Sequence, residues 1–247
     1  MRIALLADIH SNLEALQACL AHARRESVER YVFLGDLLGY GADPVACLDL
    51  VAELVEQGAP AVLGNHDAAC LEGDLQDMGH HARDAIYWTR KRLGPRERVF
   101  LAGLPLAVVE EDRLYVHASA DQPEAWTYIT GQRDAARALA ATPARIVLVG
   151  HVHHPLLYFT TPGGAIRVFQ PVPGVPIPLS GYRRWLIIVG SVGQPRDGNP
   201  AACYAVYDSA AGSLTHFRVP YDAQAAANKI LAAGQPERLA WRLISGY

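Results

Sequence analysis

Residues 1–12 read MRIALLADIHSN, and later parts of the chain repeat their pattern. The unbroken apolar run Ile3–Ala7 predicts a buried strand and is too short to cross a membrane. Because side chains alternate along a strand, Asp8 and His10 point the same way where this strand ends. A carboxylate beside an imidazole suits a metal ion. The same residues also fit a simpler arrangement, in which Asp8 caps the following helix and His10 is an ordinary loop histidine.

The order of apolar strand and polar turn occurs twice more in the first 70 residues. Further strands are predicted at Tyr31–Leu34 and Ala59–Leu63, with amphipathic helices between the strands at Leu13–Ala23 and Val45–Glu56. The second strand ends in Gly35-Asp36 and the third in GNHD at residues 64–67. Strands that alternate with helices pair in parallel through right-handed crossovers, and their carboxyl ends meet at one edge. The polar turns are therefore expected to lie together.

The remaining pattern predicts a second sheet and more helices. Helices are expected near Ala68–Leu71, Ala82–Leu93 and Gly131–Ala141, and one or two more over 221–247. A hairpin is expected at Leu106–Glu110 and Arg113–His117, followed by a strand at Arg145–Val149. Short strands are expected at Leu156–Thr160, Ala165–Phe169, Trp185–Val189, Ala201–Tyr207 and Ser213–Val219. The strands after Pro155 suggest a mostly antiparallel sheet, and the four prolines of Pro171–Pro178 indicate a loop or an edge. Gly94-Pro95 is expected to end a helix. We predict an α/β fold of two sheets with outer helices, as a single domain over 1–247.

Composition narrows the class of protein. The net charge is −3 and no basic block occurs, so the chain lacks the electrostatic footprint of a protein that binds duplex nucleic acid. The four cysteines are scattered without a CxxC pair, which favours reduced thiols in a cytoplasmic protein over a disulfide framework. No stretch is long enough to span a bilayer, so no membrane partner is expected. The oligomeric state cannot be read from the sequence.

Potential metal ligands gather at the predicted strand ends. They are Asp8, His10, Asp36, Asn65, His66, His117, His151 and His153. Seven of these eight residues, all except His66, could supply ligands, which is too many for one ordinary site and suits two adjacent metals that share a carboxylate. Nitrogen and oxygen donors without a thiolate favour Mn, Fe, Zn, Co or Ni over Ca or Mg, with Mn expected to support activity. Two divalent ions outweigh the two carboxylates, and the resulting positive site would attract a phosphate.

Such a site predicts hydrolysis of a phosphate ester. Two metals about 3.5–4 Å apart can generate a hydroxide at neutral pH for in-line attack on phosphorus. His66, beside the candidate ligand Asn65, is the candidate acid for the leaving oxygen, and Asp67 is a candidate to orient or charge it. The histidines without motif context, His22 and His216, are expected at the surface.

Five motifs occur in the order that is typical of one family. DIH (Asp8–His10), GDLLG (Gly35–Gly39), GNHD (Gly64–Asp67), the histidine of YVHAS (His117) and GHVH (Gly150–His153) resemble the calcineurin-like metallophosphoesterases. The resemblance implies a four-layer α/β/β/α sandwich with two mixed sheets flanked by helices. It also implies that Asp8, His10 and His153 bind one metal, that Asn65, His117 and His151 bind the other, that Asp36 bridges, and that His66 is an acid or transition-state stabiliser.

The same resemblance narrows the range of expected substrates. The family's protein phosphatases extend the second motif to GDxVDRG, whereas this chain reads GDLLGYG, which argues against protein phosphatase activity. GDLLGYGADP (35–44) and GSVGQPRDGNP (190–200) resemble small prokaryotic enzymes of the phosphodiesterase-like and diadenosine-tetraphosphatase-like branch. The expected substrate is a small phosphorylated molecule, either a phosphodiester or a nucleotide polyphosphate. A scaffold with weak activity, or a nucleotide-sensing module, is the alternative.

Two residues outside the five metal-site motifs are candidates for substrate binding. Arg196 follows a strand and could hold a phosphate through bidentate hydrogen bonds. A structural turn built on Arg196 and Asp197 accounts equally for this position. Tyr40 lies four residues after Asp36 and could stack on a base or bond a phosphate, whereas a packed loop tyrosine is the simpler interpretation.

Overall fold

The computed structural model describes residues 1–72, 75–76 and 78–247. A five-stranded sheet has the order β2-β1-β10-β11-β8. Its strands are β1 (Arg2–Leu6), β2 (Arg30–Phe33), β8 (Ile177–Pro178), β10 (Ala202–Asp208) and β11 (Ser213–Val219). β1 pairs in parallel with β2 and antiparallel with β10, so the sheet is mixed. The proline-rich segment supplies only the two-residue edge strand β8, which fits its lack of backbone donors.

The second sheet has six strands in the order β3-β4-β5-β9-β6-β7. They are β3 (Ala107–Glu110), β4 (Arg113–Val116), β5 (Ile146–Val149), β6 (Leu156–Thr160), β7 (Ile166–Phe169) and β9 (Trp185–Ile188). β4, β5 and β9 run parallel, and the outer pairings are antiparallel. The expectation that the strands after Pro155 form one antiparallel sheet is wrong, because β10 and β11 join the first sheet beside β1. β10 is buried on both faces, and such a strand carries no local signal for its partner.

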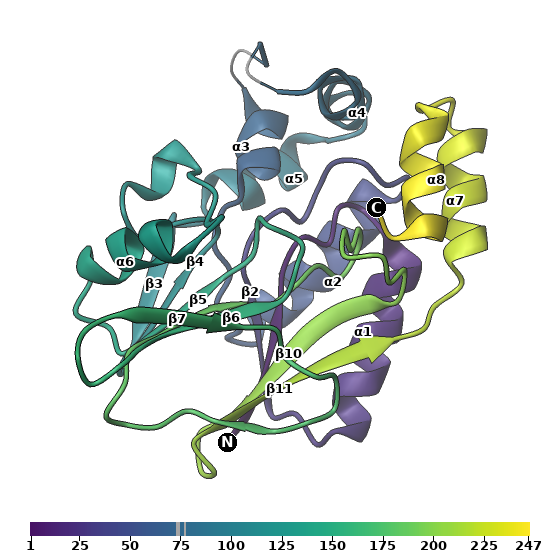
Figure 1. Cartoon of the computed structure of the whole chain (residues 1–247). Helices are drawn as coiled ribbons and strands as arrows, with labels where there is room; N and C mark the ends of the chain where they lie inside the picture. The colour runs from purple at the N-terminus through teal and green to yellow at the C-terminus, as the bar shows by residue number, and fades with distance from the viewer. Residues whose placement is uncertain (73–74, 77) are drawn as a thin grey trace.

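Apolar clusters separate four layers (Figure 1). α1 (Leu13–Arg25) and α2 (Pro44–Glu56) cover the outer face of the first sheet, where they pack on Leu6. The neighbouring residue Leu5 lies in the cluster between the two sheets. α6 (Gln132–Ala140) covers the outer face of the second sheet. The predicted α/β/β/α sandwich is confirmed, since consecutive side chains of β1 point into different layers.

Other helices surround the carboxyl ends of the strands. They are α3 (Asn65–Leu71), α4 (His80–Arg90), α5 (Pro95–Ala102), the 3₁₀ turn η1 (Pro123–Ala125), α7 (Ala223–Ala232) and α8 (Glu237–Ser245). The helices α7 and α8 form a pair beside α1 (Figure 1). Among the described residues, no helix has the length and apolarity that a membrane span requires.

Three local expectations are wrong. Ala59–Leu63 lies beside β2 but forms only an isolated bridge from Ala61 to Phe33, because Pro60 has no N–H for a ladder. Gly94-Pro95 does not end a helix, because α4 already ends at Arg90; it begins α5 instead, in which Pro95 occupies the first turn. His216 is buried in β11, where its Nε2 donates to the carbonyl of Ile188 at 3.2 Å.

Candidate metal centre

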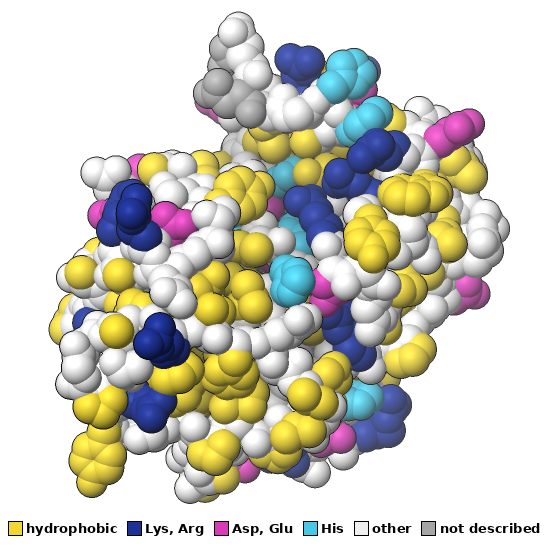
Figure 2. Space-filling model, in the orientation of Figure 1, with side chains coloured by type: hydrophobic (Ala, Val, Ile, Leu, Met, Phe, Trp, Pro, Cys, Tyr) yellow, Lys and Arg dark blue, Asp and Glu magenta, His cyan; other side chains and the backbone are white. Residues whose placement is uncertain are grey.

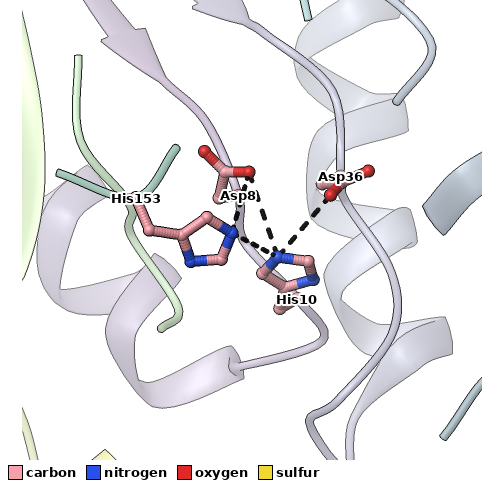
Figure 3. Close-up of side chains that lie close together, drawn as sticks. All are labelled: Asp8, His10, Asp36 and His153. Carbon is pink, nitrogen blue, oxygen red and sulfur yellow. Dashed lines mark hydrogen bonds and ion pairs between the residues drawn. The ribbon is translucent and has the colours of Figure 1, made fainter. Parts of the chain in front are cut away.

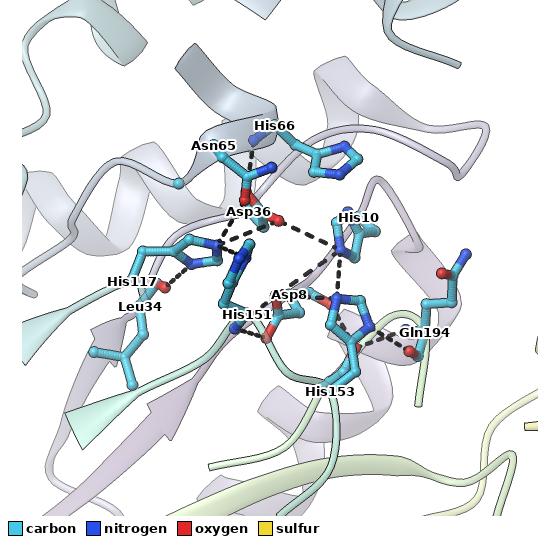
Figure 4. A network of polar contacts seen from close by, with 12 residues as sticks. Asp8, His10, Leu34, Asp36, Asn65, His66, His117, His151, His153 and Gln194 are labelled. Atoms are coloured by element: carbon cyan, nitrogen blue, oxygen red, sulfur yellow. Dashed lines mark hydrogen bonds and ion pairs between the residues drawn. The ribbon is translucent and has the colours of Figure 1, made fainter. Parts of the chain in front are cut away.

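The loops after the parallel strands meet at one edge of the sandwich (Figure 4). Asp8 and His10 follow β1, Asp36 follows β2, Asn65 and His66 lie in the first turn of α3, His117 follows β4, and His151 and His153 follow β5. Backbone hydrogen bonds join these loops, since His10 N donates to the carbonyl of Asp36 at 3.0 Å and Gly150 N donates to that of His117 at 2.9 Å. The structure therefore brings together all eight residues that the sequence places at strand ends.

Four of these side chains form a first buried cluster, consisting of Asp8, His10, Asp36 and His153 (Figure 3). Nε2 of His153 lies 3.2 Å from Oδ1 of Asp8. Nε2 of His10 lies 3.7 Å from Oδ2 of Asp36 and 3.1 Å from Nε2 of His153. Two carboxylates and two imidazoles thus surround one point.

A second cluster shares Asp36 with the first and adds His117 and His151. Oδ2 of Asp36 lies 3.4 Å from Nε2 of His117, which itself is 3.2 Å from Nδ1 of His151. Oδ1 of Asn65 also lies 3.1 Å from Nε2 of His117. One carboxylate oxygen of Asp36 therefore lies next to ligand atoms of both clusters, an arrangement that suits two adjacent cations.

Backbone carbonyls orient three of the histidines. Nδ1 of His10 donates to Leu38 O at 2.9 Å, and Nδ1 of His117 donates to Leu34 O at 2.7 Å. Nδ1 of His153 likewise donates to the carbonyl of Gln194 at 2.6 Å. A carbonyl can only accept, so Nδ1 of each ring carries a proton, and whenever the ring is neutral its Nε2 carries a lone pair directed at the cluster.

This tautomer makes the first cluster suited to a cation. Nε2 of His10 and Nε2 of His153 face each other at 3.1 Å, although both carry lone pairs. Burial lowers the pKa of His10 well below its usual value, so protonation of His10 does not relieve this contact near neutral pH. A divalent metal between the nitrogens would satisfy both. The residues present therefore fit a metal ion.

The carboxylate of Asp36 dominates the local field. Burial acts to raise its pKa, but the charges of His117 and His66 and the hydrogen bond with His117 hold that pKa well below its usual value. Burial acts to lower the pKa of His117, and Asp36 outweighs it, so this pKa rises to about 9. The central carboxylate is therefore ionised and available to cations.

Backbone strain is concentrated at the same residues. Five of the cluster residues have positive φ angles: Asp8 (53°), His10 (50°), Asp36 (52°), His151 (65°) and His153 (62°). Left-handed backbone is unfavourable for residues other than glycine and is held only where the surroundings enforce it. The turns thus aim side chains inward at a cost in stability, which is typical of a functional site.

Asp67 anchors two loops. Its Oδ1 accepts from Leu38 N and its Oδ2 accepts from Gly64 N, each at 3.0 Å. Burial, followed by the charge of Asp36, raises its pKa to about 7. Within the described part of the chain, no hydrogen bond joins Asp67 to the imidazole of His66, whose Nδ1 is buried without a partner. Asp67 thus holds the two motif loops together.

A cleft of about 520 Å³ opens beside the second cluster. Asn65, His66 and His151 form its polar side, and Trp126 and Tyr128 form an aromatic wall. The ring of Tyr128 stacks on His151 with centroids 3.8 Å apart. Trp126 and Tyr128 lie in no motif, and the aromatic content of this segment is the only sequence signal for them.

Arg196 and Asp197 do not pair with each other, as they would in a structural turn built on these two residues. The carboxylate of Asp197 pairs with Arg218 of β11. The guanidinium of Arg196 instead donates to Oε1 of Gln194, at 2.9 Å from Nη2, and lies 5.6 Å from the ring centroid of Tyr40. The centroid of the Tyr40 ring lies 4.6 Å from that of His10, in the first cluster, and 4.6 Å from that of His66. Both candidate residues therefore lie beside the clusters.

Comparison with known proteins defines the class. The model of the calcineurin-like phosphoesterase superfamily domain matches residues 1–212. The chain belongs to this superfamily. It is 33% identical to an uncharacterized protein of Methanocaldococcus jannaschii, over 99% of this chain and 98% of that protein.

Solved structures agree with this membership. A metallophosphoesterase from Sphaerobacter thermophilus is 37% identical, with a TM-score of 0.87 over 100% of this chain and 99% of that chain. A hypothetical protein from Pyrococcus horikoshii is 20% identical, with a TM-score of 0.80 over 100% of this chain and 98% of that chain, and it shows the same fold.

Proposed function

We propose that this protein is a metal-dependent phosphoesterase that hydrolyses a small phosphorylated molecule. The observation that carries the proposal is the carboxylate of Asp36, which faces two buried clusters of potential ligands. Asp8, His10 and His153 would hold one divalent metal, Asn65, His117 and His151 the other, and Asp36 would bridge them. Bound metals would supply the positive charge that attracts a phosphate and lowers the pKa of water. Mn²⁺ is the metal expected to support activity.

The cleft beside the second cluster supports a small substrate with an aromatic or nucleoside group. Its volume of about 520 Å³ lies within the range of small-molecule sites. Tyr128 and Trp126 offer ring faces next to His151, where a planar leaving group or a base can stack. A phosphodiester or a nucleotide would place its phosphate at the clusters and its ring in the cleft.

His66 is the group proposed to act on the phosphate oxygens. It lines the cleft, and burial lowers its pKa to about 4, a shift that Asp36 opposes. The imidazole is therefore neutral near pH 7, which favours transition-state stabilisation through its N–H over donation of a proton. Asp67 supports this position indirectly, through the backbone of the motif loops.

The test combines metal analysis with two substrates. Protein loaded with Mn²⁺ is assayed with bis(p-nitrophenyl) phosphate and p-nitrophenyl phosphate, and its metal content is measured. Asp36→Asn removes the shared charge, so we expect loss of metal and a fall in turnover of about 10²-fold or more. Asp49→Asn, the same change on the exposed face of α2, is the matched control and should retain both.

Two results would contradict the proposal. If the protein binds no metal under any loading condition, the clusters are not a metal centre and the scaffold interpretation is favoured. If metal binds fully but neither ester is turned over, general hydrolysis of phosphate esters is ruled out, and a sensor or an enzyme of narrow specificity remains.

A further inference from the structure

Two arginines from distant parts of the chain donate hydrogen bonds to the same uncharged amide oxygen. Arg196 donates to Oε1 of Gln194 through Nη2 at 2.9 Å and Nε at 3.3 Å. Arg242, on α8, donates to the same oxygen through Nη1 at 3.3 Å. Gln194 is only 1% exposed. A buried amide therefore holds two guanidinium groups close together.

Among the residues that the structure describes, no carboxylate pairs with either of these cations. The adjacent carboxylate of Asp197 pairs with Arg218, and within the described residues neither Arg196 nor Arg242 takes part in an ion pair. Nε of Arg242 and Nε2 of Gln194 are buried without a hydrogen-bond partner. Burial, followed by the charge of Arg196, lowers the pKa of Arg242. Like charges held together in this way are stabilised when an anion binds between them.

The fold fixes the pair. Gly198 N donates to the carbonyl of Gly246 at 2.9 Å, which ties the turn that carries Arg196 to the end of α8. On the same helix, Leu239 and Leu243 pack in the same apolar cluster as Tyr40. Arg242 therefore reaches Gln194 as part of a packed framework and not as a free surface side chain.

The pair lies directly beside the first metal cluster. The carbonyl of Gln194 accepts from Nδ1 of His153 (Figure 4). The backbone N of Arg196 donates to the carbonyl of His153 at 3.3 Å. The aromatic cleft does not include either arginine among its lining residues and opens beside the second cluster. Figure 2 shows Lys and Arg side chains next to histidines in the central hollow of this face.

We propose that Arg196 and Arg242 form a subsite for a second phosphate group, next to the phosphate that is attacked at the metal centre. This inference rests on the proposed function and narrows its substrates to compounds with two linked phosphates. Hydrolysis adds one water across the P–O–P bridge: the water oxygen bonds to the phosphorus at the metal centre, and the bridging P–O bond breaks. The bridging oxygen leaves with the second phosphate, and the protons of water are shared between the two products or released to solvent.

Binding by the Mn²⁺-loaded protein tests the subsite without turnover. Isothermal titration with methylenediphosphonate, which carries two linked phosphonates, is compared with methylphosphonate, which carries one. We expect the ratio of the two affinities to fall by about 10- to 100-fold in Arg242→Gln, because charge-assisted hydrogen bonds to the second group are lost. Arg242→Lys keeps the charge without the planar fork and should give an intermediate ratio.

The matched control is Arg238→Gln, an exposed arginine one turn earlier on α8, which should keep the wild-type ratio. Thermal unfolding and metal content are measured for each variant. An unchanged ratio in folded, metal-loaded Arg242→Gln would overturn the subsite and leave Arg242 with a structural role.

A second comparison separates this inference from the proposed function. For each variant, kcat/KM for ADP is divided by that for bis(p-nitrophenyl) phosphate, and we expect this quotient to fall about tenfold or more in Arg242→Gln. If the diester is hydrolysed and the quotient does not change, the subsite is wrong and the phosphoesterase stands. If neither substrate is hydrolysed but the binding ratio responds to Arg242→Gln, the phosphoesterase fails and the anion subsite stands.

Discussion

The loop glycine Gly39 and the imidazole of His66 are packed so closely that a Cβ atom at position 39 would lie 2.5 Å from Nδ1 of His66. Gly39 also has a φ of +88°, a conformation that disfavours other residues. Gly39 of the GDLLG motif thus packs directly against His66 of the GNHD motif. The site requires a residue without a side chain at position 39.

Gly39→Ala is expected to displace His66 and to lower turnover by about tenfold or more while metal content is kept. Gly58→Ala is the control, because Gly58 has a φ of +97° but nothing within 4 Å of its added Cβ. Both variants should lose about 1–2 kcal/mol of stability through backbone strain. If Gly39→Ala and Gly58→Ala show equal turnover, the contact with His66 has no catalytic consequence.

His66→Ala is expected to lower turnover by about 10²- to 10³-fold and to leave the metal content unchanged. The metal is retained because His66 contacts Asp36 through its backbone N–H, at 2.8 Å from Oδ1, which this substitution keeps. His66→Gln should recover part of the rate, since an amide still donates a hydrogen bond. Metal analysis and the diester assay measure both effects.

His81→Ala, an exposed histidine on α4, is the control and should behave as wild type. Full turnover in His66→Ala would refute the assignment of His66. A rate for His66→Gln no higher than for His66→Ala would instead favour a proton-transfer role.

The buried His216 predicts a pH dependence of stability. Burial lowers its pKa to about 4 from 6.5, so between these values the unfolded chain binds more protons than the folded one. Stability should therefore fall as the pH drops through this window, by roughly 3 kcal/mol from this residue.

His216→Gln keeps a donor for the carbonyl of Ile188 but cannot titrate. Urea unfolding of metal-free wild type and His216→Gln, from about pH 7 to about pH 4, gives the difference in unfolding free energy. We expect the unfolding free energy of His216→Gln to rise relative to that of wild type as the pH falls. A difference that does not vary with pH would contradict the prediction.

The grouping of the candidate metal ligands follows from local sequence. Asp8, His10 and Asp36 come directly after short apolar runs that predict buried strands, and parallel strands bring such ends to one edge. The same logic applies to His117 and His151. The layers were also predictable, because the apolar residues of Ile3–Ala7 leave no polar face for solvent.

Tertiary structure alone decided which distant partners were chosen. Whether Asp197 pairs with Arg196 or with Arg218 depends on where β11 lies, and no local pattern records that position. Arg242 gave no sequence signal, since only the packing of α8 brings it to Gln194. Short-range patterning therefore determined the strands and the residues at their ends, whereas pairing across long separations in the chain depends on competition between partners, which the complete fold resolves.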